Sequence, residues 1–187
     1  MDTIQFELGG GASIALPADK VASALFERLQ QQHPAQPTRY KIGEYLHGQG
    51  GIYAGDIQGD DGVLYGLAIG KEQDIGKAKW GPDGERDLSE WDGPGNTNRL
   101  NRADHPAAYL AAQYEVDGHM DFYLPARREF LIAMANVPKL FGKDSYYWTS
   151  TPIGSSSAWA VAFESGLVSL LNRSYEFRVR PFRRFTY

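Results

Sequence analysis

The 187-residue sequence contains no cysteine. This absence excludes disulfide frameworks, thiolate metal sites and cysteine nucleophiles together. No apolar run approaches the length of about 20 residues that a membrane-spanning helix needs. An excess of positive charge is also missing: the formal net charge is −4, which argues against a globally basic nucleic-acid-binding protein. The first ten residues lack the basic and apolar segments of a signal peptide.

The residues that are present describe a globular chain. Apolar residues make up 42% of the sequence, aromatic residues 13% and charged residues 22%, which excludes a disordered or fibrous protein. A chain of this length buries roughly 70% of its unfolded surface, so it needs no metal or disulfide to fold. The length is sufficient for one full domain and a small additional unit.

The first 32 residues predict a small β-β-α unit. Apolar and polar residues alternate over 3–8 as in a short strand, and residues 13–16 return as its hairpin partner after a glycine turn. Pro17 and Asp19 then begin a helix that runs to about Gln32.

One side of this helix is apolar, because Val21, Leu25 and Leu29 recur every four residues. Such a stripe must pack against another surface: the main domain, a sister copy or another protein. The segment that follows the helix has two prolines and no periodic pattern, which indicates a linker. The predicted organisation is a docking unit at 1–32, a linker at 33–39 and a main domain at 40–187.

The main domain is predicted to combine strands with two helices. One helix is expected over 104–114, where Asp104 is suited to cap its start, and a second over 127–136. Residues 76–101 are rich in Gly, Pro, Asp and Asn and predict a long loop, while the last forty residues alternate as strands do. Trp148 and Trp159 lie in these alternating segments and are expected in the core.

Candidate metal ligands are present but poorly spaced. The four histidines form no pair at the i, i+4 spacing of helical ligands. An oxygen-rich loop offers hard ligands suited to calcium, although its spacing differs from that of an EF-hand loop. Carboxylates in such a loop are usually solvated, so we expect no cofactor and no metal, with calcium as the alternative. The oxygen ligands of this loop are Asp83, Glu85, Asp87, Glu90, Asp92, Asn96, Asn98 and Asn101.

The sequence offers no recognisable arrangement for covalent or acid–base catalysis. Residues 150–157 are rich in serine but lack a Gly-x-Ser-x-Gly turn. Asp117 and Asp121 are near enough in sequence to act as an acid–base pair, yet beside Gly118 they are more typical of turns. Gly48–Gly51 precede a strand pattern, which indicates a turn and not a phosphate-binding loop. We therefore expect a protein that is not an enzyme.

Several segments of the main domain carry a shared signature. Asp121–Phe130 contains Leu-Pro followed four residues later by Glu, and it is succeeded by Tyr147–Thr151, Ala158–Phe163 and Tyr175–Pro181. Together these segments resemble the bacterial and prophage C-type-lectin-like domains related to the C-terminal domain of collagen-like (Lcl) adhesins. The opening Gly48–Gly55 is similar to the version carried by tailed phages and prophages.

This resemblance covers about residues 40–185 and implies an α+β fold: a C-type-lectin-like domain with two helices and a mainly antiparallel sheet. Ala126 stands where the family often has Ser or Thr, so Glu129 lacks the reciprocal half of a capping box and the helix start is weaker by about 1 kcal/mol. The calcium-type sugar site of animal lectins needs motifs that 91–93 match poorly. Enzymes of the wider fold use cysteines or a histidine-rich iron site, so the resemblance implies a binding module.

The same fold is used by phage tropism determinants, which are distant relatives and vary exposed residues in the C-terminal half. The resemblance therefore implies a ligand-binding face at the matching positions of this chain. Tyr, Ser and Asn suit such a face because they supply rigid aromatic area and adaptable hydrogen bonds, although several of these residues also fit ordinary turns. The candidate ligand-binding residues are Tyr146, Ser155, Ser156, Ser157, Asn172, Arg173, Ser174 and Tyr175.

The leading interpretation is a phage or prophage structural protein at a tail fibre or baseplate. It is expected to bind a host cell-surface receptor, either a glycan or a protein, to contact other tail proteins, and to form a homo-oligomer, with a trimer as one option. We expect it to be made in the host cytoplasm and to act in the virion, without nucleic-acid binding or membrane insertion. An intracellular interaction or assembly factor with the same fold is the alternative, and an oxygenase-like enzyme is a third.

Overall fold

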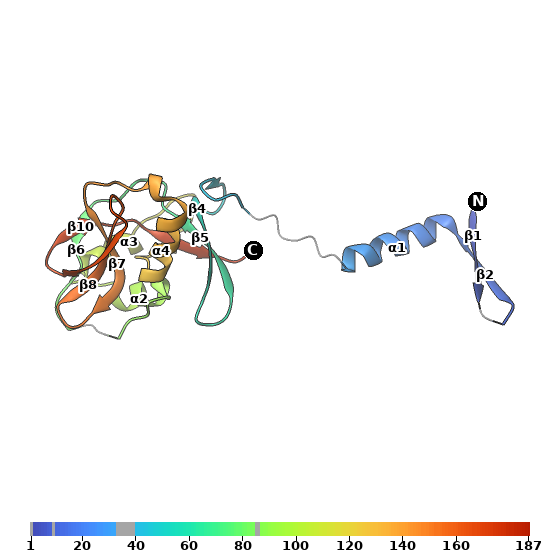
Figure 1. The fold of residues 1–187 in the computed structure, drawn as a ribbon, viewed down its shortest axis with the longest axis horizontal. Coiled ribbons are helices and arrows are strands. Elements are labelled where there is room, and N and C mark those ends of the chain that lie inside the picture. The colour runs from blue at the N-terminus through green and yellow to red at the C-terminus, as the bar shows by residue number, and fades with distance from the viewer. Residues whose placement is uncertain (1, 9, 33–39, 85–86) are drawn as a thin grey trace. The chain divides into compact units, whose positions relative to one another are not determined.

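A computed structural model describes residues 2–8, 10–32, 40–84 and 87–187. The chain divides into two compact units, 1–39 and 40–187 (Figure 1). The described residues form a mixed α+β structure with four α-helices and several mostly antiparallel sheets. The predicted linker, 33–39, lies outside the described residues. None of the described helices is both long and apolar enough to cross a membrane.

The N-terminal unit consists of a hairpin followed by one helix. Strand β1 (Thr3–Leu8) pairs with β2 (Ala12–Pro17) in antiparallel register, and α1 (Ala18–Gln32) begins directly after the hairpin. Every second residue of a strand lies on the same face of the hairpin. The apolar residues therefore share one face, where Phe6 is paired with Ile14. The expected β-β-α order is therefore present.

The main domain contains two sheets, where the sequence predicted one. The four-stranded sheet has the order β11-β5-β4-β3 and is antiparallel throughout. Its strands are β3 (Tyr45–Leu46), β4 (Gly51–Gln58), β5 (Leu64–Ile69) and β11 (Phe182–Phe185). The last strand of the chain thus returns beside the first long strands of the domain.

The second sheet has five strands in the order β6-β10-β7-β8-β9. All its pairings are antiparallel except the short parallel contact of β10 with β7. Its strands are β6 (Lys77–Lys79), β7 (Tyr146–Ile153), β8 (Ser157–Ala162), β9 (Leu167–Asn172) and β10 (Glu176–Arg178). Since β9 and β10 lie on opposite sides of the β7–β8 pair, the residues between them must cross this sheet.

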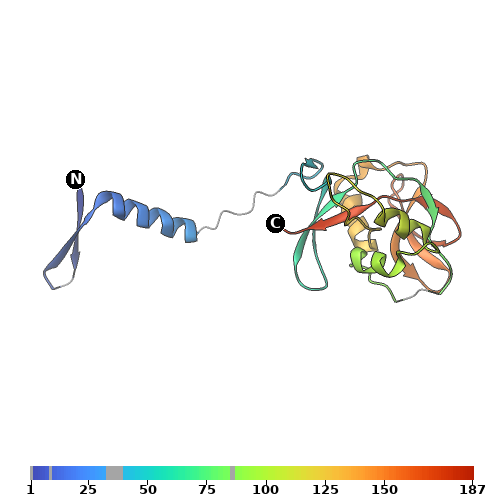
Figure 2. The ribbon, with the colours of Figure 1, turned by 180° about the vertical axis from the view of Figure 1, so that it is seen from behind.

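The described residues of the main domain form three α-helices, one more than the two that were predicted. These are α2 (Gly93–Leu100), α3 (Pro106–Ala112) and α4 (Arg127–Asn136), with a short 3₁₀ helix at Pro138–Leu140. Figure 2 shows α2 and α3 next to each other. Helix α4 agrees with its predicted bounds, and α3 begins with His105 as the N-cap in place of Asp104.

The predicted loop over 76–101 is wrong in two places, because it contains β6 and α2. Glycine and asparagine disfavour a helix interior, which conceals α2 in the sequence. The helix starts because the Asp92 carboxylate accepts a hydrogen bond from the backbone N–H of Gly95 at 3.1 Å, and Pro94 occupies its first turn.

Helix α4 connects the two sheets through an aromatic core. It packs against β4 of the four-stranded sheet and against β7 and β8 of the other. The ring of Phe130 lies within 5.1 Å of Phe182 and 5.7 Å of Phe163, measured between ring centroids. A second core, beneath α2 and α3, holds the fully buried Trp80 and Trp148.

The two tryptophans that were expected in the core differ in how deeply they are buried. Trp148 is fully buried, as predicted, and its indole N–H donates to the carbonyl of Ala78 at 2.9 Å. Trp159 is half-buried, because its partner across the β8–β9 pair is Leu170, a residue that is 51% exposed. The Arg127 guanidinium covers the Trp159 ring at 4.6 Å from the ring centroid.

Candidate functional site

The structure brings most of the predicted ligand-binding residues together at one end of the five-stranded sheet. Ser157, at the start of β8, pairs with Asn172, at the end of β9. Residues 154–156 connect β7 to β8, and residues 173–175 connect β9 to β10. The two loops are joined directly, since the backbone N–H of Arg173 donates to the carbonyl of Ser156 at 3.1 Å. We call residues 153–157 and 172–175 the loop face.

Arg173 is a correction to the predicted set, because it is only 1% exposed and faces inward. Its guanidinium donates to the carbonyls of Pro82 at 2.9 Å, Ser157 at 3.2 Å and Gly154 at 3.2 Å. It also lies 4.3 Å from the centroid of the Trp80 ring. Arg173 therefore joins two segments of backbone, at Pro82 and at 154–157, and its charge faces inward.

The side chains around Arg173 point outward. Asn172, Ser174 and Tyr175 are exposed, and the three serines of the other loop are half-buried. The Asn172 side-chain oxygen accepts hydrogen bonds from the Ser174 backbone N–H at 2.9 Å and its hydroxyl at 2.6 Å. This local turn fixes the backbone beside Tyr175, whose ring is 56% exposed. The loop face thus has a rigid base and a polar and aromatic surface.

Tyr146 lies away from the serines, and Phe177 connects it to the loop face. The Phe177 ring centroid is 5.3 Å from that of Tyr146 and 5.8 Å from that of Tyr175. Tyr146 and Phe177 line a hollow of about 340 Å³, which we call the aromatic hollow. Its other lining residues are Lys143, Asp144, Ser145, Ala162, Glu164 and Ser165. Sequence reasoning missed Phe177, although its alternation with Tyr175, just before β10, was a signal for a shared face.

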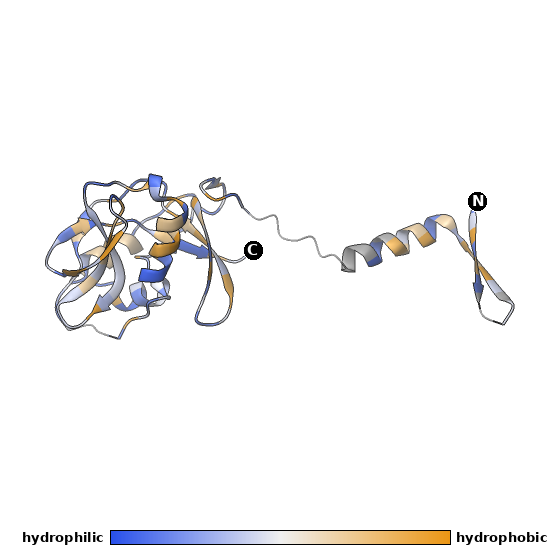
Figure 3. Cartoon of the chain, in the orientation of Figure 1, coloured by the Kyte–Doolittle hydropathy of each residue, from blue (hydrophilic) through white to orange (hydrophobic). Residues whose placement is uncertain are grey.

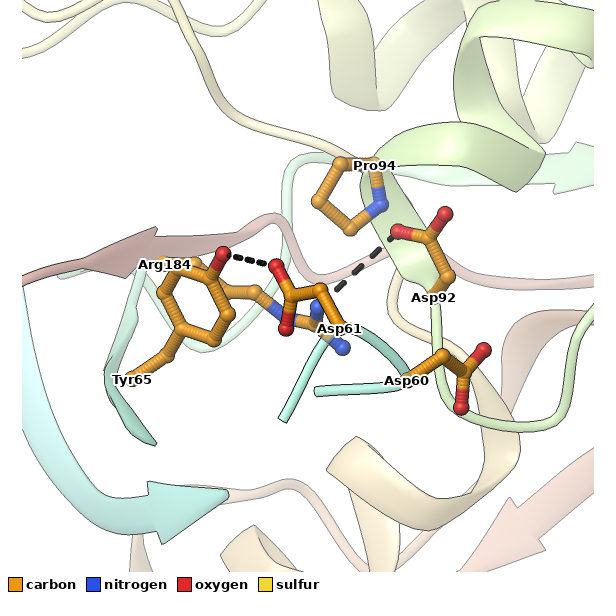
Figure 4. Close-up of a pocket in the computed structure, with 6 residues that line it drawn as sticks. All are labelled: Asp60, Asp61, Tyr65, Asp92, Pro94 and Arg184. Atoms are coloured by element: carbon orange, nitrogen blue, oxygen red, sulfur yellow. Dashed lines mark hydrogen bonds and ion pairs between the residues drawn. The ribbon is translucent and has the colours of Figure 1, made fainter. Parts of the chain in front are cut away.

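A second, more acidic cavity of about 300 Å³ lies beside the β4–β5 hairpin. Figure 4 shows its six lining residues, with the Tyr65 hydroxyl donating to Asp61 at 2.6 Å. This hydrogen bond holds the pKa of the Asp61 carboxyl below its usual range. Arg184 lies 3.9 Å from the Asp92 carboxylate on the opposite wall, so the charges of this cavity are partly paired within it.

Behind this cavity, Arg184 reaches the fully buried carboxyl of Glu129. Glu129 accepts hydrogen bonds from the Arg184 Nε at 2.6 Å, the Tyr123 hydroxyl at 2.7 Å and the Ala126 backbone N–H at 2.7 Å. The bond from Ala126 is one half of a capping box; the other half would need a side-chain hydroxyl at Ala126. Burial nevertheless raises the pKa of Glu129 to about 7, because loss of water outweighs the attraction of the Arg184 guanidinium.

Asp117 and Asp121, which were considered as an acid–base pair, serve separate roles. Asp117 adopts a positive φ of 52° in a turn with Gly118 and accepts a hydrogen bond from the Tyr45 hydroxyl at 2.7 Å. Asp121 accepts a hydrogen bond from the Arg183 guanidinium at 2.5 Å. Asp117 is therefore the turn residue that the sequence indicated, whereas the pairing of Asp121 with Arg183 was not predicted.

Three of the predicted oxygen ligands in the loop are used in contacts within the domain. Asp92 caps α2, the Asn96 amide donates to Ser89 and Ser150, and Glu90 pairs with Arg127 at 2.6 Å. Glu85 lies outside the described residues. Across the described residues, no three side chains of His, Asp or Glu are arranged to hold a metal ion. No family model matches the chain, and a search of curated proteins finds no match.

Proposed function

We propose that residues 40–187 form a non-enzymatic recognition module, with a C-type-lectin-like fold, in the tail fibre or baseplate of a phage or prophage. The loop face would bind a host-surface receptor. The observation that carries the proposal is the buried Arg173, which ties the two loops to the core from inside. A surface held in this way loses little conformational freedom when it binds a ligand.

The outward chemistry suits a glycan or a protein surface. Exposed Tyr175 offers a rigid ring, and Asn172 and Ser174 offer adaptable hydrogen bonds beside it. The aromatic hollow adds a floor of Tyr146 and Phe177 with charged residues at its rim. An aromatic floor packs against the apolar face of a sugar ring or a side chain, while the rim bonds the polar groups around it.

Binding of the full chain to a host envelope preparation, and to the polysaccharide purified from it, tests the proposal. Tyr175→Ala is expected to weaken binding at least tenfold, because it removes the most exposed aromatic ring of the loop face. Tyr109→Ala is the matched control: Tyr109 is 45% exposed but lies on α3. Equal binding by wild type and Tyr175→Ala, or loss in the control alone, would contradict the proposal.

A separate experiment distinguishes the virion protein from an intracellular interaction factor with the same fold. Particles are purified after induction of the phage or prophage and analysed by quantitative mass spectrometry. A constant copy number per particle is expected for a tail protein. Recovery of the chain in the cell lysate alone, with none in particles, supports the intracellular factor instead.

A further inference from the structure

We propose that the N-terminal unit is a self-association module: its apolar notch between hairpin and helix is filled by the same unit of a second copy of the chain. This inference concerns residues 2–32 and is independent of ligand recognition by the main domain. It rests on three observations, which are the exposed apolar face of the hairpin, the shape of the notch, and the charges around it.

The hairpin leaves one apolar face uncovered. In the β1–β2 register, Ile4 is paired with Leu16 and Phe6 with Ile14, so these four side chains share one face. They are between 40% and 47% exposed, although residues of this kind are normally buried in a folded protein. Figure 3 shows hydrophobic segments in the hairpin and again along α1.

Helix α1 completes the surface. Together the hairpin and the helix form a concave notch of about 270 Å³, with an apolar wall on each side. On the helix side Leu25 is the largest apolar side chain of the notch, and it is 57% exposed. The residues that line the notch are Phe6, Leu16, Lys20, Val21, Ala24, Leu25 and Arg28.

A unit of this size needs a partner to be stable. An isolated two-stranded hairpin is marginally stable in water, and so is an isolated helix of about 15 residues. Chains below about 40 residues usually require disulfides, metals or oligomerisation to fold. The sequence has no cysteine, so disulfides are excluded as the source of stability. Burial of the notch against another apolar surface supplies the additional stability that the unit needs to stay folded.

The exposed apolar area of two copies comes close to that of a specific interface. Five aliphatic and aromatic side chains that are 40–57% exposed leave on the order of 400–500 Å² of apolar surface per copy. Two copies therefore approach the roughly 1,000 Å² expected of a specific interface, before the polar rim is counted. In an isologous interface the same patch of each copy faces the other, so the apolar wall of each unit would meet the apolar notch of its partner.

The charges of the unit favour a second copy as the occupant. Lys20 and Arg28 line the notch, where they present two positive charges. The same unit carries carboxylates outside the notch lining, so each copy offers negative groups to the cations of its neighbour. Among the described residues of the unit, these carboxylates are Asp2, Glu7, Asp19 and Glu27.

Light-scattering mass and sedimentation equilibrium of the full chain test the inference over a hundredfold range of concentration. Wild type is expected at a discrete multiple of 20.8 kDa. Leu25→Glu and Ile14→Lys are expected to shift it to the monomer mass, because each places a charge in the buried interface. The matched control is Ser23→Glu, an exposed position of α1 that is not part of the notch lining and is expected to leave the mass unchanged.

An internal readout separates loss of assembly from unfolding of the main domain. All four tryptophans lie in 80–159, within the main domain, so tryptophan fluorescence reports on that domain alone. Leu25→Glu, in the notch, and Ile14→Lys, on the apolar face of the hairpin, are expected to retain the wild-type spectrum while the measured mass falls to that of the monomer. A wild-type monomer at every concentration, or a multimer that survives both variants, overturns the inference. Either result leaves the binding test of Tyr175→Ala unaffected, so failure of one proposal is distinguishable from failure of the other.

A mixed preparation identifies the partner. Tagged and untagged chains are expressed together in a heterologous cell, without other phage genes, and purified through the tag. Stoichiometric recovery of the untagged chain is expected if a second copy fills the notch. Recovery of the tagged chain alone overturns self-association and indicates docking on the main domain or on a different protein.

Discussion

The guanidinium of Arg173 lies 4.3 Å from the centre of the Trp80 ring and donates at 2.9 Å to the carbonyl of Pro82. The backbone N–H of Trp80 in turn donates to the carbonyl of Arg173 at 3.0 Å. These contacts attach the link between β9 and β10 to a segment more than 90 residues earlier in the chain. The position of the loop face therefore depends on a buried side chain beneath it.

Replacement of Arg173 by Met is expected to destabilise the protein by about 2–4 kcal/mol, because buried carbonyl groups lose their donors. Urea unfolding followed by circular dichroism measures the change. Arg99→Met is the control, since Arg99 is exposed and donates to one carbonyl, that of Asp87. We expect that control to cost less than about 1 kcal/mol. Equal effects for the two variants would show that Arg173 does not hold the loops.

Glu129 makes the stability of the main domain depend on pH. Its pKa rises from 4.5 to about 7 on folding, so the folded state holds the proton more tightly than the unfolded state. The resulting stabilisation is complete below pH 4.5 and is lost as the pH rises to 7. The free energy of unfolding of wild type, relative to Glu129→Gln, is expected to fall by on the order of 2–3 kcal/mol over this range.

Chemical denaturation of wild type and Glu129→Gln at a series of pH values checks this dependence. Glu164→Gln serves as the control, because Glu164 is exposed and its curve is expected to run parallel to that of wild type. A wild-type advantage that grows between pH 4.5 and pH 7 would mean that Arg184 holds Glu129 ionised, with a lowered pKa.

Gly51 is expected to tolerate no side chain. A Cβ atom at this position would lie 2.6 Å from the carbonyl oxygen of Ile69, which belongs to the neighbouring strand backbone and cannot turn away. Gly51→Ala is therefore expected to cost about 2–3 kcal/mol by forcing β4 and β5 apart. Gly62→Ala meets open space and carries only the strain of a φ of +79°, about 1 kcal/mol. Thermal unfolding measures both variants. A larger loss of stability for Gly51→Ala than for Gly62→Ala is expected if steric overlap with the backbone of β5 costs more than a positive φ.

Ala126→Ser is expected to stabilise α4 by about 1 kcal/mol. The added hydroxyl would accept a hydrogen bond from the backbone N–H of Glu129, completing the capping box whose other half is already formed. Ala133→Ser, also fully buried on α4 but inside the helix, is the control and is expected to destabilise the protein. A loss of stability at Ala126 as large as that at Ala133 would show that the N-cap site has no room for a hydroxyl.

Local patterns in the sequence were sufficient to predict the elements whose structure depends mainly on neighbouring residues. The alternation over 3–8 and the four-residue stripe on α1 depend on neighbours in sequence, so hairpin and helix could be predicted without a fold. Helix α4 was found in the same way, with its end before Pro138. Helix α2 was missed because its glycines and asparagines disfavour a helix, and the Asp92 cap offsets them.

The tertiary structure alone decided the rest. A basic residue between Asn172 and Ser174 is normally exposed, and the sequence accordingly placed Arg173 on the surface. It is buried because two separate segments bring carbonyls to it: Pro82 lies after β6, and Gly154 and Ser157 lie at the β7–β8 connection. Local periodicity carries no information about such distant contacts. The types of residue on the loop face were thus readable from the sequence. The burial of Arg173 beneath them was decided by contacts that form only when the segment after β6 lies against the loops at one end of the five-stranded sheet.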